Sequence, residues 1–244
     1  MNDNIIKLKE AISKSNNIVI FSGAGLSTNS GIPDFRSADG LYNQKTNYMV
    51  KPEEIISHSF FMSNTRDFYS FYFDKMIYPN ALPNLAHKYF ADLEKEGKNI
   101  TVVTQNIDDL HQMAGSTNVI ELHGSVKRNY CMKCHKFYDL ASIYKKDIPY
   151  CNCGGIIKPD VVLYEESLNQ DDIFKAIDAI SRCEVLIIVG TSLTVYPAAG
   201  FVRYFRGKHL VLLNKTATQY DNMADIVIND DIKNVVIELE KNER

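Results

Sequence analysis

The sequence lacks the features that would place a protein in a membrane, on an export route or on a nucleic acid. Its longest apolar runs, such as residues 185–189, are far too short to cross a bilayer. The first 13 residues contain no apolar signal-peptide core and instead predict an amphipathic helix. The net charge of −3 comes with dispersed lysines and arginines, so no basic surface for nucleic acid is expected. We therefore expect a cytoplasmic protein that binds neither membranes nor nucleic acids directly.

Internal repeats, low-complexity tracts and flexible linkers are also missing. The 244 residues, 45% of them hydrophobic and 23% charged, suffice for one sizeable domain or for a domain with a smaller insert. We expect this unit to be a monomer.

Cysteine is scarce, and four of the five cysteines are grouped. Cys131 and Cys134 form a C-x-x-C pair, and Cys151 and Cys153 form a C-x-C pair after 16 intervening residues. In a reducing compartment, two such pairs predict a tetrahedral zinc site rather than disulfides. His135 is an alternative ligand, but four thiolates already complete the coordination shell. A closed shell leaves no open position, so we expect one structural Zn²⁺ per chain.

Short buried strands alternate with helices along most of the chain, which predicts an α/β fold with a Rossmann-like, doubly wound parallel sheet. The expected strands lie at 18–21, 100–104, 119–122, 185–189, 209–213 and 224–228, and the aromatic-rich stretch 52–78 is expected to be helical. We assign residues 1–36, 79–124 and 159–244 to the Rossmann-like domain. A smaller lobe would comprise a helical insertion at 37–78 and the zinc-binding module at 125–158.

A glycine-rich turn, residues 22–28, follows the first expected strand. Strand, glycine turn and helix start together predict a phosphate cradle, although a plain tight turn is the alternative. The pattern is G-x-G-x-x-T, with Thr28 in place of the usual third glycine. The acidic residue that holds the ribose hydroxyls in dehydrogenases is missing. The turn therefore favours a dinucleotide held in an unusual way over routine hydride transfer.

Two further polar clusters follow the expected strands. The loop at 31–42 presents Phe35 and Arg36, which could close over a ligand or form an ordinary surface turn. The stretch 104–124 presents Asn106 and Asp108 after one strand and His123 after the next. Helix capping and a turn histidine would explain these three residues equally well. In a parallel sheet, however, the strand-end turns at 22–28, 104–108, 190–192 and 214 should share one rim.

In combination these motifs resemble the sirtuin family, the NAD-dependent protein deacylases, and most closely its bacterial lysine deacetylases. The matching motifs are GAGLST (23–28), GIPDFR (31–36), TQNID (104–108), ELHG (121–124), the four cysteines, KPDVVLYEE (158–166), GTSLTVYP (190–197) and the pair at 213–214. Their occurrence in this order over nearly the whole chain is highly specific.

The resemblance implies a role for each matching residue. His123 would be the catalytic base, and Asn106 would order the ribose and a water. NAD would be contacted by Ala24, Thr28, Phe35, Arg36, Gln105, Ile107, Asp108, His123, Thr191, Ser192, Asn214 and Ile232. An acyl-lysine peptide or protein would pair with a strand that contains Val161, Val162, Tyr164 and Glu165. The products would be nicotinamide, O-acetyl-ADP-ribose and free lysine.

The sequence departs from the family pattern at several positions. Asp109 replaces a glycine of QNIDGLH, and Tyr164-Glu165-Glu166 replaces the frequent phenylalanine-glycine-glutamate. Relatives that prefer succinyl or malonyl groups carry a tyrosine and an arginine three residues later, whereas Tyr69 is followed at that spacing by Tyr72. We therefore expect a neutral acyl group, acetyl or longer. Mono-ADP-ribosyl transfer and a non-catalytic binding module are the alternative functions.

Overall fold

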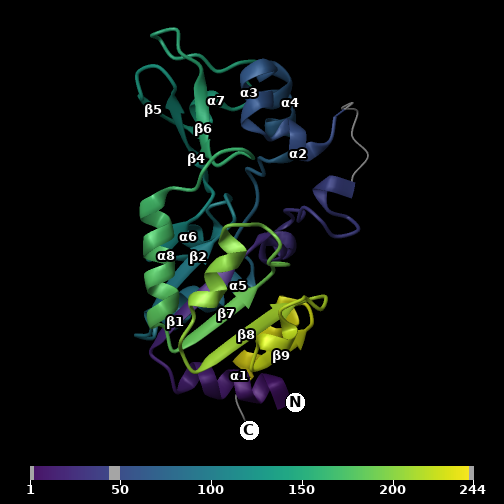
Figure 1. The fold of residues 1–244 in the computed structure, drawn as a ribbon, viewed down its shortest axis with the longest axis vertical. Helices are drawn as coiled ribbons and strands as arrows, with labels where there is room; N and C mark the ends of the chain where they lie inside the picture. The colour runs from purple at the N-terminus through teal and green to yellow at the C-terminus, as the bar shows by residue number, and fades with distance from the viewer. Residues whose placement is uncertain (1–2, 44–49, 242–244) are drawn as a thin grey trace.

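A six-stranded parallel sheet forms the centre of the structure, a computed structural model that describes residues 3–43 and 50–241. The strands follow the order β3-β2-β1-β7-β8-β9 (Figure 1). They are β1 (Asn17–Ser22), β2 (Asn99–Thr104), β3 (Val119–Glu121), β7 (Val185–Val189), β8 (His209–Asn214) and β9 (Ile226–Asn229). The strand order reverses between β1 and β7, the kind of position where open α/β sheets bind ligands. The predicted Rossmann-like fold is confirmed.

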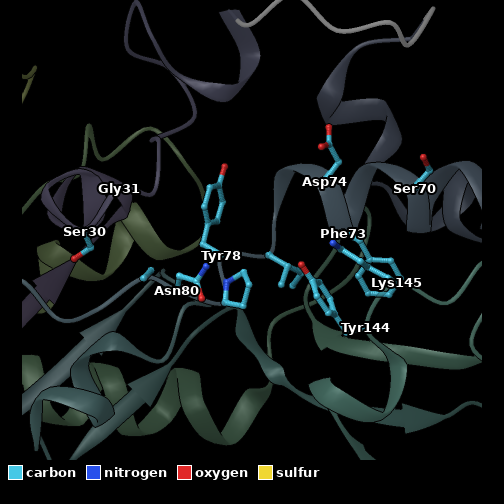
Figure 2. A pocket seen from close by; sticks show the side chains of 12 residues that line it. Ser30, Gly31, Ser70, Phe73, Asp74, Tyr78, Asn80, Tyr144 and Lys145 are labelled. Carbon is cyan, nitrogen blue, oxygen red and sulfur yellow. The ribbon is translucent and has the colours of Figure 1, made fainter.

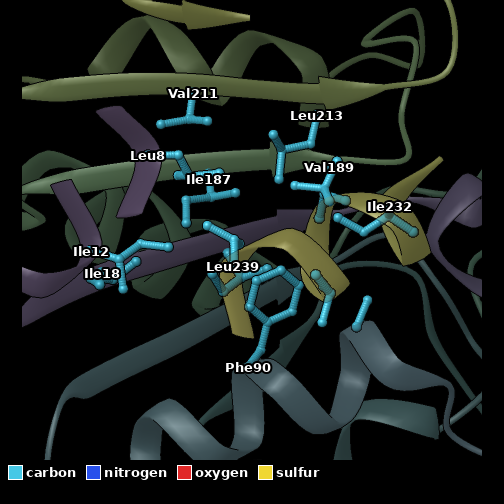
Figure 3. Packing of buried hydrophobic residues seen from close by; sticks show 14 of the residues in the cluster. Leu8, Ile12, Ile18, Phe90, Ile187, Val189, Val211, Leu213, Ile232 and Leu239 are labelled. Atoms are coloured by element: carbon cyan, nitrogen blue, oxygen red, sulfur yellow. The ribbon is translucent and has the colours of Figure 1, made fainter. Parts of the chain in front are cut away.

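Helices cover both faces of this sheet, as a doubly wound fold requires. One face carries α1 (Asp3–Ser13), α5 (Leu85–Lys95) and α9 (Ile232–Glu240). The other carries α8 (Gln170–Arg182) and the 3-10 helix η3 (Ala198–Tyr204). Figure 3 shows the first layer, in which Phe90 and Leu239 belong to the same buried cluster as Ile187 of β7. Burial of these apolar faces is the main source of the sheet's stability.

A smaller lobe lies at the top of Figure 1. It contains an antiparallel sheet in the order β5-β4-β6 and four short helices. These elements are α2 (Pro52–Ile55), α3 (His58–Ser63), α4 (Thr65–Lys75), β4 (Gly124–Cys131), β5 (Phe137–Asp139), α7 (Leu140–Ile143) and β6 (Ile157–Val161). Phe61 and Tyr69 of the helices share a buried cluster with Val126 of β4 and with Leu163, which follows β6. The two sequence segments therefore pack together on a common core.

The expected helical stretch 52–78 is divided into three helices rather than one. Ser57 caps α3 by accepting a hydrogen bond from the N–H of Phe60. On either side of Ser57, the backbone pairs with Tyr164: the His58 N–H donates to the Tyr164 carbonyl, and the Tyr164 N–H donates to the Ile56 carbonyl, both at 3.0 Å. This pairing with a distant segment interrupts the helix, so the interruption is a tertiary effect.

The remaining short elements lie in the connections. They are η1 (Ala24–Ser30), η2 (Leu41–Asn43), α6 (Leu110–Ala114) and η4 (Asp221–Met223). None of the helices in the described part of the chain has the length and apolar character needed to cross a membrane. Parts of the predicted segments, at residues 1–2, 44–49 and 242–244, lie outside the described residues.

Asp109 provides a test of backbone strain at the start of α6. Its φ is 68°, in the left-handed region, and its side chain makes no capping hydrogen bond. We expect Asp109→Val to lower the free energy of unfolding by about 1–2 kcal/mol relative to Asp109→Gly, because a β-branched residue tolerates this conformation poorly. Urea denaturation of the two variants measures the difference, with Asp109→Asn as the matched control. Equal stability of the Val and Gly variants would show that the backbone at position 109 does not impose this strain.

Candidate active site

A cleft of about 1490 Å³ lies between the large sheet and the smaller lobe. It is larger than the roughly 300–1,000 Å³ typical of a pocket for one small molecule. Every residue expected to act in catalysis, NAD binding or peptide binding lines it. These residues are Ala24, Thr28, Phe35, Arg36, Gln105, Asn106, Ile107, Asp108, His123, Val161, Val162, Tyr164, Glu165, Thr191, Ser192, Asn214 and Ile232. The structure thus brings them to one place, while the role of each remains a prediction.

The floor of the cleft is formed where the turns after β1 and β7 touch. The N–H of Gly25 donates to the Gly190 carbonyl at 2.8 Å, and a Cβ at Gly25 would lie 2.9 Å from the Gly190 Cα. A Cβ at Gly190, whose φ is 63°, would lie 2.2 Å from the backbone nitrogen of Leu26. Backbone packing at the switch point therefore requires these glycines, independently of any ligand.

A line of hydrogen bonds runs along the rim across four strand ends. His123 Nδ1 lies 2.9 Å from the Gln105 carbonyl oxygen. The Gln105 side-chain amide donates to Thr191 Oγ1 at 3.2 Å, and the Thr191 N–H donates to Asn214 Oδ1 at 2.9 Å. The Asn214 side-chain NH₂ is buried and has no partner. This donor is therefore available to a polar ligand in the cleft.

The hydrogen bond of His123 determines which of its ring nitrogens carries the proton. A carbonyl oxygen can only accept, so Nδ1 must donate and Nε2 keeps a free lone pair. Burial lowers the pKa of His123 below its usual value, with partial opposition from the Gln105 carbonyl. The imidazole is therefore neutral at physiological pH and can accept a proton at Nε2.

Asn106 and Asp108 are held against the glycine-rich turn. The Asn106 side-chain NH₂ donates to the Gly23 carbonyl at 3.1 Å and lies 3.2 Å from Ser27 Oγ. The Ser27 hydroxyl donates to an Asp108 carboxylate oxygen at 2.6 Å, and the other carboxylate oxygen accepts from the Leu110 N–H. Burial is the largest influence on Asp108 and raises its pKa. Ser27 was not among the expected site residues, although it lies within the GAGLST motif that pointed to its neighbour Thr28.

The loop at 31–42 forms one wall of the cleft. Asp34 Oδ1 accepts from the backbone N–H groups of Arg36 and Ser37, which stabilises a tight turn. The Arg36 guanidinium lies 5.5 Å from the centre of the Tyr42 ring, and Phe35 packs edge-on against the same ring. Arg36 is exposed, so its charge can meet a phosphate. This cation, the rim donors and the cleft volume fit a dinucleotide.

The four grouped cysteines form a compact cluster in the smaller lobe. Their sulfur atoms all lie within 4.8 Å of one another, and three of the pairs are 3.4–3.6 Å apart. A tetrahedral Zn²⁺ with 2.3 Å Zn–S bonds separates its sulfurs by about 3.8 Å, close to this arrangement. Backbone N–H donation, and then the Tyr138 hydroxyl, lower the pKa of Cys151 to about 6. The cluster therefore fits a tetrahedral metal, and His135 is not part of it.

A second, smaller cavity of about 670 Å³ lies beside the cleft (Figure 2). Tyr78 stands on one side of it, and Phe73 and Tyr144 lie on the other. Gly31, Ile77, Tyr78 and Pro79 line both spaces. Of the residues that the structure describes around this cavity, none was expected in the site.

Tyr69, the residue on which the acyl-group argument was based, does not line the cleft. It is fully buried and its hydroxyl donates to the Ile157 carbonyl. Tyr72, three residues later, does line the cleft. Of the two positions used in that argument, only the second therefore faces the ligand space, and the expected preference for a neutral acyl group remains a prediction.

A Rossmann-like sheet whose strand-end rim faces a second lobe across a deep cleft defines a two-lobed, dinucleotide-binding class of protein. A model of the Sir2 family matches residues 23–197. The NAD-dependent protein deacetylase of Clostridium perfringens is 61% identical over 239 residues, 97% of this chain and 98% of that protein. The NAD-dependent protein deacetylase of Staphylococcus epidermidis is 44% identical, covering 96% of each chain.

Solved structures of Sir2 proteins share the fold. One that holds a deacetylated p53 peptide and 3'-O-acetyl ADP ribose has a TM-score of 0.87 at 37% identity, covering 96% of each chain. A Sir2 complex with p53 peptide and NAD⁺ has a TM-score of 0.82 at 38% identity, covering 96% of this chain and 95% of the other. The chain belongs to the Sir2 family.

Substitution of Tyr164 tests whether its hydroxyl joins the two walls of the cleft. Its hydroxyl lies 2.9 Å from that of Tyr42 in the 31–42 loop. Burial, and then the Tyr164 hydroxyl, raise the pKa of Tyr42, so this hydroxyl stays protonated. Loss of one such hydrogen bond costs about 0.5–1.5 kcal/mol, so we expect Tyr164→Phe to raise the KM for NAD roughly 2- to 10-fold with little change in kcat.

Steady-state kinetics on an acetylated peptide measures this effect. Tyr42→Phe should give the same change, and the double variant should add nothing further because both remove the same bond. Tyr150→Phe, an exposed tyrosine of the smaller lobe, is the matched control. Fully additive effects would show that the two hydroxyls act separately.

Proposed function

We propose that this chain catalyses NAD-dependent deacetylation of lysine side chains in proteins with His123 as the general base. The enzyme is an NAD-dependent protein deacetylase. One observation carries the assignment of the base: a neutral imidazole with Nδ1 bound to the Gln105 carbonyl and Nε2 free, in a cleft that joins both lobes. When bound, NAD supplies an activated ribose carbon to which the acyl group is transferred.

The residues around His123 bind and orient NAD. Arg36 and the turn at 23–28 hold the phosphates, while Thr191, Ser192, Asn214 and Ile232 contact the adenosine half. Ile107 and Asp108 form the pocket for the nicotinamide carboxamide, and Gln105 keeps the histidine in its tautomer. Asn106 orients the ribose and a water, and Phe35 excludes other water from the reacting carbon. His123 Nε2 accepts the proton of a ribose hydroxyl.

The peptide substrate pairs with the segment that contains Val161, Val162, Tyr164 and Glu165. The Val162 N–H already donates to the His123 carbonyl at 3.0 Å, so this segment is fixed directly beside the base. An extended peptide added here would gain backbone hydrogen bonds and place its acyl-lysine in the cleft. Tyr72, Val126 and Leu163 line the same cleft, and no arginine stands at position 72. These neighbours favour a neutral acyl group.

The cysteine cluster holds one structural Zn²⁺, which stabilises the smaller lobe and takes no part in the chemistry. Four thiolates close the coordination shell, as in structural sites. The reduced cysteines suit a cytoplasmic enzyme. We assign 1–36, 79–124 and 159–244 to the Rossmann-like domain and 37–78 and 125–158 to the smaller lobe, and β6 (Ile157–Val161) runs across the boundary at 158–159. The enzyme acts as a monomer on acyl-lysine proteins without direct contact with nucleic acid or membranes.

Zinc content provides a test that does not depend on activity. We expect about one Zn²⁺ per chain by elemental analysis, and much less in Cys134→Ser, together with a lower thermal midpoint because metal binding contributes to folding. Cys183→Ala is the matched control, because Cys183 is buried away from the cluster. Full zinc content in Cys134→Ser would contradict the assignment of this ligand.

Removal of the base tests the function directly. We expect His123→Ala to lower kcat for deacetylation of an acetylated peptide by about 10²–10⁴-fold, the usual contribution of general base catalysis, with an unchanged melting temperature. His209→Ala is the control, because His209 lies at the start of β8 and does not line the cleft. Near-wild-type turnover of His123→Ala would refute this mechanism.

The pH profile of the wild-type enzyme completes the test. Because the base must be neutral and burial lowers its pKa, the fall of kcat/KM on acidification should have its midpoint below the usual histidine pKa of 6.5. Mono-ADP-ribosyl transfer is the competing function that uses the same cleft. Labelled protein from radioactive NAD, without peptide deacetylation, would favour it.

A further inference from the structure

Two histidines are buried side by side beneath the strand-end rim, outside the cleft. His87 of α5 is 0% exposed and His111 of α6 is 1% exposed, and their ring centres are 4.9 Å apart. One nitrogen of each ring, His87 Nε2 and His111 Nδ1, is buried without a hydrogen-bond partner. Buried polar atoms of this kind are rare and call for an explanation.

The neighbours of His87 define its tautomer. The backbone N–H of Asn84 donates to His87 Nδ1 at 3.3 Å, within the capping box of α5. Nδ1 therefore carries a lone pair, and the proton of the neutral ring lies on Nε2. Burial lowers the pKa of His87 to about 4, so the ring is neutral at physiological pH. The unpartnered nitrogen of His87 is a donor.

The neighbours of His111 define the same tautomer but leave the other ring nitrogen without a partner. The Ser22 hydroxyl donates to Thr104 Oγ1 at 2.9 Å, so its oxygen can only accept from His111 Nε2, which lies 2.9 Å away. The proton of His111 is therefore on Nε2 and Nδ1 carries a lone pair. Burial also lowers the pKa of His111. The unpartnered nitrogen of His111 is an acceptor.

A donor and an acceptor, each without a partner, thus belong to two rings in contact. We propose that one buried water accepts from His87 Nε2–H and donates to His111 Nδ1, and that the two histidines position Asn106 for the reaction. This inference rests on the proposed function only for the role of Asn106. The bridge completes a chain from Asn84 through both rings and Ser22 to Thr104.

The end of the chain reaches the active site through one further contact. Thr104 Oγ1 accepts the backbone N–H of Asn106 at 3.0 Å, while the Asn106 side chain contacts Gly23 and Ser27. From His87 to Thr104 the bonds run head to tail, so each donor polarises the next, and at Thr104 Oγ1 the Ser22 hydroxyl and the Asn106 N–H converge on one acceptor. Loss of the histidine link frees the Ser22 and Thr104 hydroxyls to rotate, and Asn106 loses its fixed orientation.

Kinetics of His111 variants test the positioning role. We expect His111→Leu to lower kcat roughly 10- to 100-fold with the KM for NAD changed less than about 2-fold, because small misplacements of reacting groups are costly. His111→Gln keeps a donor that can reach Ser22 and should recover most of this loss. His209→Gln is the matched control. Equal kcat in His111→Leu and the wild type, or equal losses in the Leu and Gln variants, would overturn the proposal.

Nuclear magnetic resonance of protein with ¹⁵N-labelled histidine tests the chain itself. We expect both rings in the Nε2–H tautomer, with slowly exchanging imidazole protons, and loss of the protected His87 proton in His111→Leu. An Nδ1–H tautomer of His111, or titration of both rings near pH 6.5, would show that the proposed chain of hydrogen bonds does not form. This readout needs no turnover, so failure of the chain is distinguishable from failure of the proposed deacetylase activity.

Discussion

The active site depends on one backbone contact, the packing of the first glycine turn against Gly190 at the switch point of the sheet. The N–H of Gly23 donates to the Val189 carbonyl and that of Gly25 to the Gly190 carbonyl, so the two turns are joined without intervening side chains. Ala24 and Thr191, the residues next to these glycines, both line the cleft. Any Cβ at Gly25 or Gly190 would separate β1 from β7 at the point where the ligand must lie.

This contact also explains how far the sequence could predict the site. Strand alternation placed four polar turns on one rim because parallel strands all end at the same edge. The glycines were attributed to phosphate binding, whereas the structure shows that they are already required by packing on Gly190. The two explanations are compatible, since a turn without side chains leaves its surface open to a ligand.

Features that depend on pairing between distant segments were not predictable. The interruption of 52–78 comes from backbone bonds to Tyr164, and β4 forms because it pairs with β5 on one side and β6 on the other. The link between Tyr42 and Tyr164 spans 122 positions. Local secondary-structure propensity and hydrophobic periodicity do not predict these pairings, because each depends on a partner segment far away in the sequence.

Two carboxylate residues occupy backbone conformations that favour glycine, and the structure holds them in different ways. Asp109 and Glu165 both have positive φ, 68° and 74°. The Glu165 carboxylate accepts from the Ser59 N–H at 2.8 Å and from its hydroxyl at 2.9 Å, so hydrogen bonds offset its backbone strain. Asp109 has no such capping bond, but its charge acts on the neighbouring Asp108.

That electrostatic effect acts on the chemistry of the cleft. Burial raises the pKa of Asp108, and the neighbouring charge of Asp109 raises it further, against hydrogen bonds from Ser27 and Leu110. Burial lowers the pKa of His123 in the same space. Both shifts favour neutral groups, because a charge in a desolvated cleft is costly. The base is thereby kept ready to accept a proton, and Asp109 adds a small further rise to the pKa of its neighbour Asp108.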